Sequence, residues 1–211
     1  MRSSEVLSRA AAQSAGVLEA LAEVKVALVQ VLGQECAVVY RTDASEIARR
    51  RAEGFTGVTR LDLLDLFLGL PLGMPVLAAS LTRREKNLLR QAPDGCVEVQ
   101  SGLVTRHLTV PLTVEMAVVA ADDWNTALDR ASEFAPFCNR AILLSQLPGD
   151  VDHLLIEAAY YGIGVAVVYG ADVELLAAPE RFIKRHYKAA GWWFAEEVYR
   201  QVSGKSQSQA V

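Results

Sequence analysis

The fold is decided by the stretch LTVEMAVVAADDWNTALDRASEFAPFCNRAILLS, residues 112–145. Its opening residues, Leu112–Ala120, are rich in valine and predict a strand. Apolar side chains then recur at spacings of three and four, which predicts a helix over Asp122–Cys138 with one buried face. Ala141–Ser145 predicts a second strand. Strand, helix and strand in this order indicate an α/β domain with a crossover connection.

The chain after residue 145 continues the same alternation. Val151–Tyr161 predicts a helix, and Val165–Tyr169 and Val173–Leu176 predict two more strands. Glu180–Val202 predicts a C-terminal helix with many aromatic side chains. These side chains either pack on the domain or form an interface with a protein partner, since Trp and Tyr anchor interfaces. Ser203–Val211 is polar and is expected to be a disordered tail.

The N-terminal region, residues 1–35, is predicted to be one long helix over Ser4–Leu32. Apolar residues recur there at alternating spacings of four and three, so they form a single stripe. The stripe either packs on the helix's own domain or forms the coiled-coil seam of a homodimer. Gly33 supplies the expected end of the helix.

Residues 36–102 predict a helical region that leads into a β-hairpin. A short strand is expected first, at Ala37–Tyr40. Three helices and two strands then follow in chain order, at Ser45–Glu53, at Leu61–Leu68, from the capping box Thr82–Glu85, at Cys96–Val99 and at Leu103–Val110. Helix, turn, basic helix and hairpin in this order resemble a winged helix, a DNA-binding module with one helix in the major groove.

Two groups of basic residues in this region are candidates for contact with nucleic acid. The first group shares one face of the predicted basic helix, and the second is a run on the preceding helix: Arg83, Lys86 and Arg90, and Arg49, Arg50 and Arg51. The formal net charge of −4 argues against indiscriminate binding to polyanions, because phosphate contacts by Lys and Arg supply most nonspecific affinity. Any DNA contact is therefore expected to be local.

The second half of the chain also resembles a known superfamily. Segments similar to the core of the PD-(D/E)XK nucleases are Val114–Val118, Asp123-Trp124, Ala127-Leu128, Ala131, Phe134, Phe137 and Ala141–Ser145, followed by Tyr161–Val165 and Val173–Leu176. The resemblance covers Leu103–Pro179 and implies a mixed sheet flanked by helices, preceded by the winged helix that some members carry. It also implies phosphodiester hydrolysis with Mg²⁺ held by carboxylates and a lysine that orients the attacking water.

The residues that such a reaction needs are incomplete in this chain. Glu115 keeps the carboxylate of the E-x-K triplet, whose first and third side chains share a face of a strand, but Ala117 replaces the lysine. Gly102 stands at the place of the aspartate, and Asp94 is the alternative. Arg130 stands where some members have a glutamine. Glu115 is therefore expected to be a vestigial catalytic residue. If the protein binds a metal ion, Glu115 is the expected ligand. No cofactor is expected, unless the protein is still a nuclease and uses Mg²⁺.

The cysteines and the apolar segments indicate the cellular compartment. The three cysteines lie 60 and 42 residues apart at positions 36, 96 and 138, which matches no zinc spacing, so they are expected to be reduced core residues. The N-terminal stretch lacks the continuous apolar segment of a signal peptide, and the apolar runs are too short to span a bilayer. The sequence therefore predicts a cytoplasmic protein without membrane contact.

Three functions remain after these observations. The first is a catalytically degenerate nuclease-fold protein that acts in DNA binding or regulation and is no longer an enzyme. The second is a protein-interaction or assembly module without nucleic-acid binding, joined to a partner or to a second copy through the N-terminal or the C-terminal helix. The third is a Mg²⁺-dependent deoxyribonuclease whose missing catalytic residue has migrated to another position.

Overall fold

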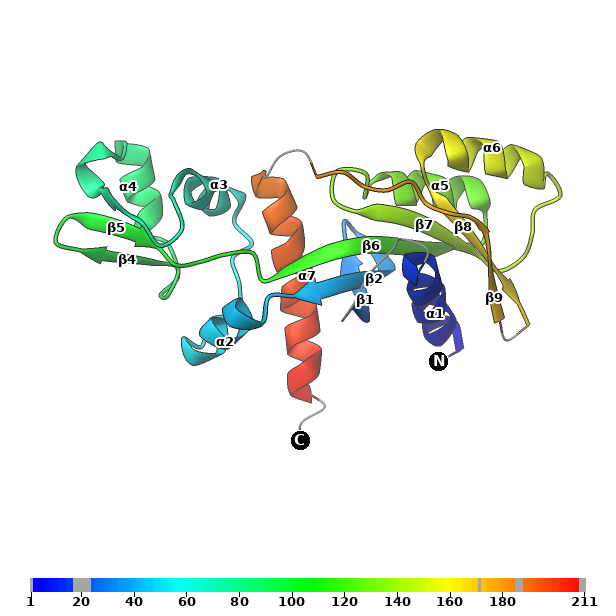
Figure 1. Cartoon of the computed structure of the whole chain (residues 1–211), viewed down its shortest axis with the longest axis horizontal. Helices are drawn as coiled ribbons and strands as arrows, with labels where there is room; N and C mark the ends of the chain where they lie inside the picture. Colours follow the sequence, from blue (N-terminus) through cyan, green and yellow to red (C-terminus); the bar gives the residue numbers. More distant parts are fainter. Residues whose placement is uncertain (1, 17–23, 171, 185–187, 209–211) are drawn as a thin grey trace. The chain divides into compact units, whose positions relative to one another are not determined.

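The computed structural model describes residues 2–16, 24–170, 172–184 and 188–208 (Figure 1). It divides into two compact units, each built from two separate stretches of chain. Unit 1 contains Met1–Arg41 and Val114–Lys184, and unit 2 contains Thr42–Thr113 and Arg185–Val211. Helices and strands occur together in both units, so the predicted α/β class is confirmed.

Unit 1 is built on a mixed sheet that has, in the described residues, six strands in the order β1-β2-β6-β7-β8-β9. The neighbouring strands β6, β7 and β8 run parallel, while the pairs β1/β2 and β8/β9 are antiparallel. Their bounds are Lys25–Val31 (β1), Gln34–Thr42 (β2), Leu112–Ala121 (β6), Asn139–Leu144 (β7), Gly164–Tyr169 (β8) and Asp172–Ala177 (β9). The strands predicted after residue 112 are therefore confirmed.

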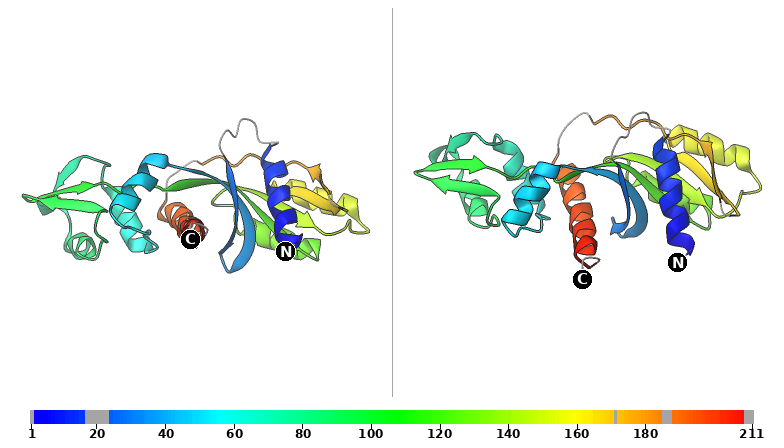
Figure 2. Two further views of the ribbon diagram at one scale, coloured as in Figure 1. Left: turned by 90° about the horizontal axis from the view of Figure 1, so that it is seen from below. Right: turned by 60° about the horizontal axis from the view of Figure 1, so that its bottom comes forward.

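Helices cover both faces of this sheet. Helix α1 (Arg2–Gly16) lies on one face, and α5 (Trp124–Ser132) and α6 (Val151–Tyr161) lie on the other (Figure 1). Figure 2 shows α1, in blue, crossing the strands of unit 1 from two further directions. Because side chains alternate along a strand, Met116 and Val118 join Leu7 of α1 in one buried cluster.

Asp123 caps the N-terminus of α5 by accepting a hydrogen bond from the Thr126 amide at 2.8 Å. The helix predicted to reach Cys138 ends at Ser132, however, and turns connect it to β7. Pro136 follows this end and has no amide hydrogen to continue a helix.

The prediction of one helix from Ser4 to Leu32 is wrong. Helix α1 ends at Gly16, residues 17–23 lie outside the described part of the chain, and Lys25–Val31 forms β1. Leu32 and Gly33 have φ angles of 54° and 76°, so they form a tight two-residue hairpin turn instead of a helix end. Ala10 and Ser14, members of the predicted stripe, are buried in unit 1, so this part of the stripe packs on its own unit.

Unit 2 contains a second sheet, and in the described residues it has three strands in the order β3-β5-β4. The elements of this unit are α2 (Ala44–Ala52), α3 (Leu61–Gly69), β3 (Pro75–Leu77), the short 3₁₀ turn η1 (Ala78–Ser80), α4 (Arg83–Leu89), β4 (Val97–Gln100), β5 (Leu103–Arg106) and α7 (Ala189–Ser208). The core of the unit joins Leu63, Leu64 and Phe67 of α3 to Val104 of β5 and Trp192 of α7.

Helix α7 differs from its prediction at both ends. Residues 180–184 are not helical, residues 185–187 lie outside the described part, and the helix starts at Ala189. It continues to Ser208, so the predicted disordered tail from Ser203 is wrong as far as that residue. Trp192, Phe194 and Tyr199 are buried, which confirms that these aromatic side chains pack within the protein.

None of the described helices is long and apolar enough to cross a membrane. The three cysteines are unpaired and buried, as predicted. Burial raises the pKa of Cys36 and of Cys96 to about 12, and it also raises the pKa of Cys138. The thiolate is the reactive form of cysteine. Two effects therefore slow the reaction of these thiols with a reagent: they are buried, and they remain protonated.

We therefore expect the native protein to react with a disulfide reagent near pH 8 on the order of a thousandfold more slowly than free cysteine does. The measurement is the rate of thiol labelling, followed by absorbance. The denatured protein is the control and should release 3 reactive thiols. Rapid labelling of the native protein would contradict the burial of these side chains.

Candidate functional site

The basic helix α4 begins as predicted. Thr82 and Glu85 form a capping box, in which the Glu85 amide donates to Thr82 Oγ1 at 3.3 Å and the Thr82 amide donates to Glu85 Oε2 at 2.7 Å. The hydroxyl and amide of Thr82 lower the pKa of the Glu85 carboxyl. The carboxylate is therefore occupied at the helix start.

The three predicted contact residues of α4 and its C-cap remain at the surface. Arg83 and Arg90 are exposed, and Lys86 is partly buried with Nζ 3.5 Å from the carbonyl oxygen of Ala79. Arg90 also donates to Asn87 Oδ1 at 3.0 Å. Sequence analysis did not single out Arg84, which is exposed on the same helix, although its place beside Arg83 was visible in the sequence.

A β-hairpin follows α4, as predicted. β4 and β5 pair antiparallel from Val97↔Arg106 to Gln100↔Leu103, and Ser101 and Gly102 turn the chain with φ angles of 52° and 78°. Gly102 therefore lies in the turn of the hairpin. On its other side β5 pairs with β3, which precedes α4 in the chain.

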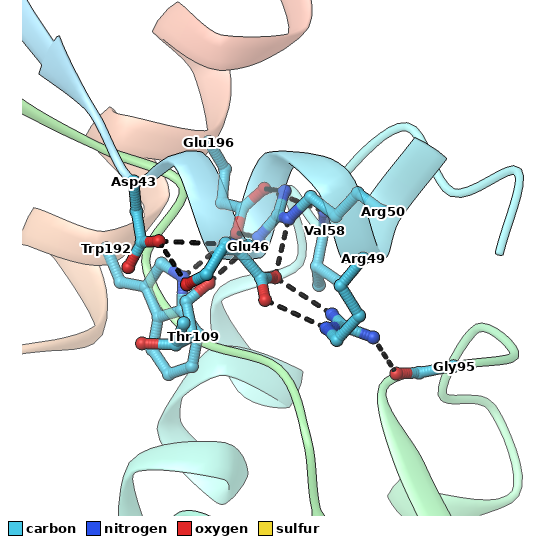
Figure 3. Close-up of polar contacts among 10 residues, drawn as sticks. Asp43, Glu46, Arg49, Arg50, Val58, Gly95, Thr109, Trp192 and Glu196 are labelled. Carbon is cyan, nitrogen blue, oxygen red and sulfur yellow. Dashed lines mark hydrogen bonds and ion pairs between the residues drawn. The ribbon is translucent and has the colours of Figure 1, made fainter. Parts of the chain in front are cut away.

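The run Arg49–Arg51 proves to be divided between surface and interior. Arg51 is exposed, Arg49 is partly buried, and Arg50 is completely buried in unit 2. Arg50 therefore has no guanidinium surface to offer to a phosphate. Its environment is a dense polar cluster between α2 and α7, drawn in Figure 3.

The guanidinium of Arg50 is bound on all sides. Nη1 and Nη2 donate to the two oxygens of Glu196, each at 2.7 Å, and Nε donates to Glu46 Oε1 at 2.7 Å (Figure 3). Nη2 also donates to the carbonyl oxygen of Thr109 at 2.9 Å. The rings of Phe55 and Tyr199 lie 5.1 and 4.8 Å from its central carbon, within the range of cation–π attraction.

The two carboxylates of the cluster are also satisfied. Glu196 accepts from the Trp192 indole at 2.9 Å and from the Val58 amide at 3.2 Å. Glu46 accepts two hydrogen bonds of 2.8 Å from Arg49, whose Nη1 donates to the Gly95 carbonyl oxygen at 2.6 Å.

Two arginines and two glutamates balance each other's charge in this cluster. Burial by itself lowers the pKa of Arg50, but the bonds and charges of Glu196 and Glu46 outweigh it and raise that pKa. Arg50 thus stays charged and joins α2 to α7 inside unit 2.

The surroundings of Glu115 also depart from the prediction. The sheet neighbours of its strand β6 are β2 and β7, whereas the preceding hairpin β4–β5 belongs to the other sheet. Asp94 and Gly102, the two predicted places of the aspartate, therefore both lie in unit 2 and not in the sheet of Glu115. The Glu115 carboxylate is paired instead with Arg41 of β2, which donates to Oε1 from Nε at 2.8 Å and also from Nη2.

These residues do not fit a Mg²⁺ site. The divalent ion needs several oxygen ligands, but Glu115 is bound by a guanidinium, and Ala117, two residues along the strand, is buried and apolar. Within the part of the chain that the structure describes, no three His, Cys, Asp or Glu side chains gather as a metal site would require.

One lysine that sequence analysis did not consider lies within electrostatic reach of Glu115. Burial lowers the pKa of Lys184, and the charge of Glu115 opposes this change. The chain is held near β6 through Asn139, which donates to the Glu115 carbonyl oxygen and accepts from the Phe182 amide, each at 2.5 Å. No local sequence pattern indicated this electrostatic interaction, because Lys184 lies far from Glu115 along the chain.

Comparison with known proteins identifies no relative: no family model, no curated protein and no solved structure matches the chain. Function is therefore inferred from the residues of this chain alone.

Proposed function

We propose that the protein binds duplex DNA through unit 2 without cleaving it. The observation that carries the proposal is the exposure of Arg83 and Arg84 on α4 and of Arg90 at its C-cap, directly before the β4–β5 hairpin in the chain. Basic side chains on a helix supply phosphate contacts, and a hairpin next to it adds a second element at the DNA backbone.

The order of the elements supports a winged helix as the architecture of this site. Helix α3 is followed by β3, η1, α4 and then β4 and β5, and β3 joins the hairpin as the third strand of the sheet. A winged helix has three helices, and the second of them would correspond here to the single 3₁₀ turn Ala78–Ser80. The basic helix of this arrangement is α4.

The local charge of α4 favours phosphate. Residues 83–90 contain four Arg or Lys and one Glu, so their formal charge is +4 − 1 = +3, against −4 for the whole chain. Glu85 is engaged by the capping box, which turns its carboxylate to the start of the helix. Attraction to DNA is therefore concentrated on this helix, and the acidic remainder of the surface disfavours other orientations.

We propose further that unit 1 is a degenerate PD-(D/E)XK fold. Glu115 on β6, the following helix α5 and the parallel strand β7 support this assignment. Arg41 beside Glu115 and Ala117 in the lysine position oppose catalysis, because the first neutralises the remaining carboxylate and the second offers no proton or charge. In this proposal, unit 1 has the strands and helices of a nuclease domain but lacks the residues that catalyse hydrolysis.

The test is a salt titration of binding to labelled duplex DNA, measured by fluorescence anisotropy with and without Mg²⁺. The double variant Arg83→Gln/Arg90→Gln should bind roughly tenfold more weakly, and the slope of log affinity against log salt should fall by about 2, since two phosphate contacts are lost. A gel of the same samples should show intact DNA.

A matched control removes two exposed arginines outside α4, Arg181→Gln/Arg200→Gln, and should keep the salt slope of the parent protein. The proposal fails if the Arg83/Arg90 variant binds with unchanged slope. Absence of binding at low salt would instead favour a protein-interaction module, and Mg²⁺-dependent cleavage abolished by Glu115→Gln would favour a nuclease, with Lys184 as its lysine.

A further inference from the structure

A cavity of about 650 Å³ opens in unit 1 at the carboxyl ends of the parallel strands. The ends of β6 and β7 are level, because Ala121 pairs with Leu144, and the chain continues from them into Asp122 and Ser145, which line the cavity. The carboxyl edge of a parallel sheet is where α/β proteins most often bind ligands. The volume is that of a small-molecule site.

Small side chains at the end of β6 create the space. Ala120 and Ala121 reach only a methyl group into it, while Leu143 of β7, Val168 of β8 and Val6 of α1 form apolar walls. Leu143 is 5% exposed and belongs to the core cluster, so this wall is a fixed part of the fold.

The polar side chains of the cavity follow one face of α5 and the turn before it. Thr126 and Arg130 are four residues apart and therefore neighbours on the helix surface, and Asp122 and Asp123 lie at its N-terminal end. Arg130 is seven positions after Asp123 in the chain, which corresponds to about 10 Å along the axis. The backbone at Arg130 is held in place, since Gln34 Nε2 donates to its carbonyl oxygen at 3.1 Å.

Opposite charges are thus separated along the cavity and do not pair with each other. In the described residues, no ion pair joins Arg130 to any carboxylate. The Thr126 amide lowers the pKa of the Asp123 carboxyl, so the negative end stays ionised near neutral pH. With one guanidinium and two carboxylates, the lining has a formal charge of +1 − 2 = −1.

This pattern selects a ligand by its charge. A dianion such as a phosphate ester meets Arg130 favourably but is repelled by two aspartates. A molecule with a cationic group at one end, an anionic group at the other and an apolar middle finds a partner for each part: the aspartates, Arg130, and the wall of Leu143 and Val168.

We propose that this cavity binds a small aminocarboxylate, with its ammonium group at Asp122 and Asp123 and its carboxylate at Arg130. The hydroxyl groups of Thr126 and Ser145 also line the cavity. The proposal concerns unit 1 alone and does not rest on DNA binding by unit 2.

The experiment is isothermal titration of the whole protein with γ-aminobutyrate and ε-aminocaproate, which carry the two charges at different separations. Caproate and hexylamine serve as probes with one charge each. We expect the aminocarboxylates to bind, the single-charge probes to bind about tenfold more weakly, and Asp122→Asn and Arg130→Gln each to weaken aminocarboxylate binding about tenfold, because each removes a charged hydrogen-bond partner.

Two exposed residues of unit 1 outside the cavity provide matched controls, Asp129→Asn for the carboxylate and Arg181→Gln for the cation, and both variants should bind as the parent protein does. Circular dichroism confirms that each variant is folded. Absence of binding for both aminocarboxylates, equal binding to the cavity variants, or tighter binding of a nucleoside monophosphate would each overturn the proposal.

Discussion

Replacement of Arg50 by Met is expected to destabilise unit 2 by about 3–5 kcal/mol. Arg50 is completely buried and is the only described residue that bonds both Glu46 and Glu196. Methionine has a similar length but no charge, so Glu196 would remain inside the protein with the Trp192 indole and the Val58 amide as its partners. Breaking a buried ion pair on one side costs more than the pair contributes, because the remaining charge cannot reach water.

Urea unfolding followed by tryptophan fluorescence measures this effect, since Trp192 lies beside the cluster. Arg51→Met is the matched control: the same change at the next residue, where the side chain is exposed, should alter the free energy of unfolding by no more than about 0.5 kcal/mol. Equal stability of the two variants would show that the cluster does not hold unit 2 together.

A double variant separates the loss of charge balance from the loss of packing. Arg50→Met/Glu196→Leu removes both charges, while Glu46 keeps its two bonds to Arg49. It should recover a large part of the stability lost in Arg50→Met, because apolar replacement of a whole buried pair is often neutral or favourable. If the double variant is as unstable as the single one, lost packing and not the unpaired charge of Glu196 causes most of the destabilisation at this site.

Gly164→Ala is expected to destabilise unit 1 by about 1–3 kcal/mol through overpacking. Gly164 begins β8 and is buried, and a Cβ placed on it would lie 2.8 Å from Cδ and 3.0 Å from the backbone nitrogen of Pro179. The side chain of Ala141 on the neighbouring strand lies 3.2 Å away on another side. Strand and loop must therefore separate to admit one methyl group.

Gly149→Ala is the control for this change. Gly149 precedes α6, has no neighbour within 4 Å of an added Cβ, and should tolerate alanine with little change in stability. The measurement is the urea midpoint seen by far-ultraviolet circular dichroism. A Gly164→Ala protein that unfolds at the same midpoint as Gly149→Ala would mean that the Pro179 segment moves freely.

The part of the fold that was predicted correctly is the part with local patterns. The α/β alternation after residue 112, the capping box at Thr82 and the hairpin around Gly102 each depend on neighbouring residues and on backbone geometry. Lys25–Val31 was misassigned because its apolar residues fit a helical spacing and a strand equally well over so short a run. Its three valines, and Val24 directly before it, favour the strand.

The candidate site was predictable only in its exposed half. Arg83 and Arg90 remain at the surface, where their own helix determines their position. Arg50 was grouped with its neighbours as a surface cation because its main partner, Glu196, lies 146 residues away in the chain. The spacing of four residues between Glu46 and Arg50 is that of an ion pair on a helix, so it indicates one bond of the cluster. It does not indicate that the cluster is buried.

The division of each unit into two stretches of chain imposes an order on synthesis. Strand β2 is made early, but its neighbour β6 emerges only after Thr42–Thr113 has left the ribosome. Folding of unit 2 is delayed further, because Arg50 of α2 forms its ion pair with Glu196 of α7, which is synthesised 146 residues later. A growing chain therefore carries Arg50 without Glu196, and α3 without α7, until residues 189–208 emerge, so unit 2 can complete its fold only after α7 has left the ribosome.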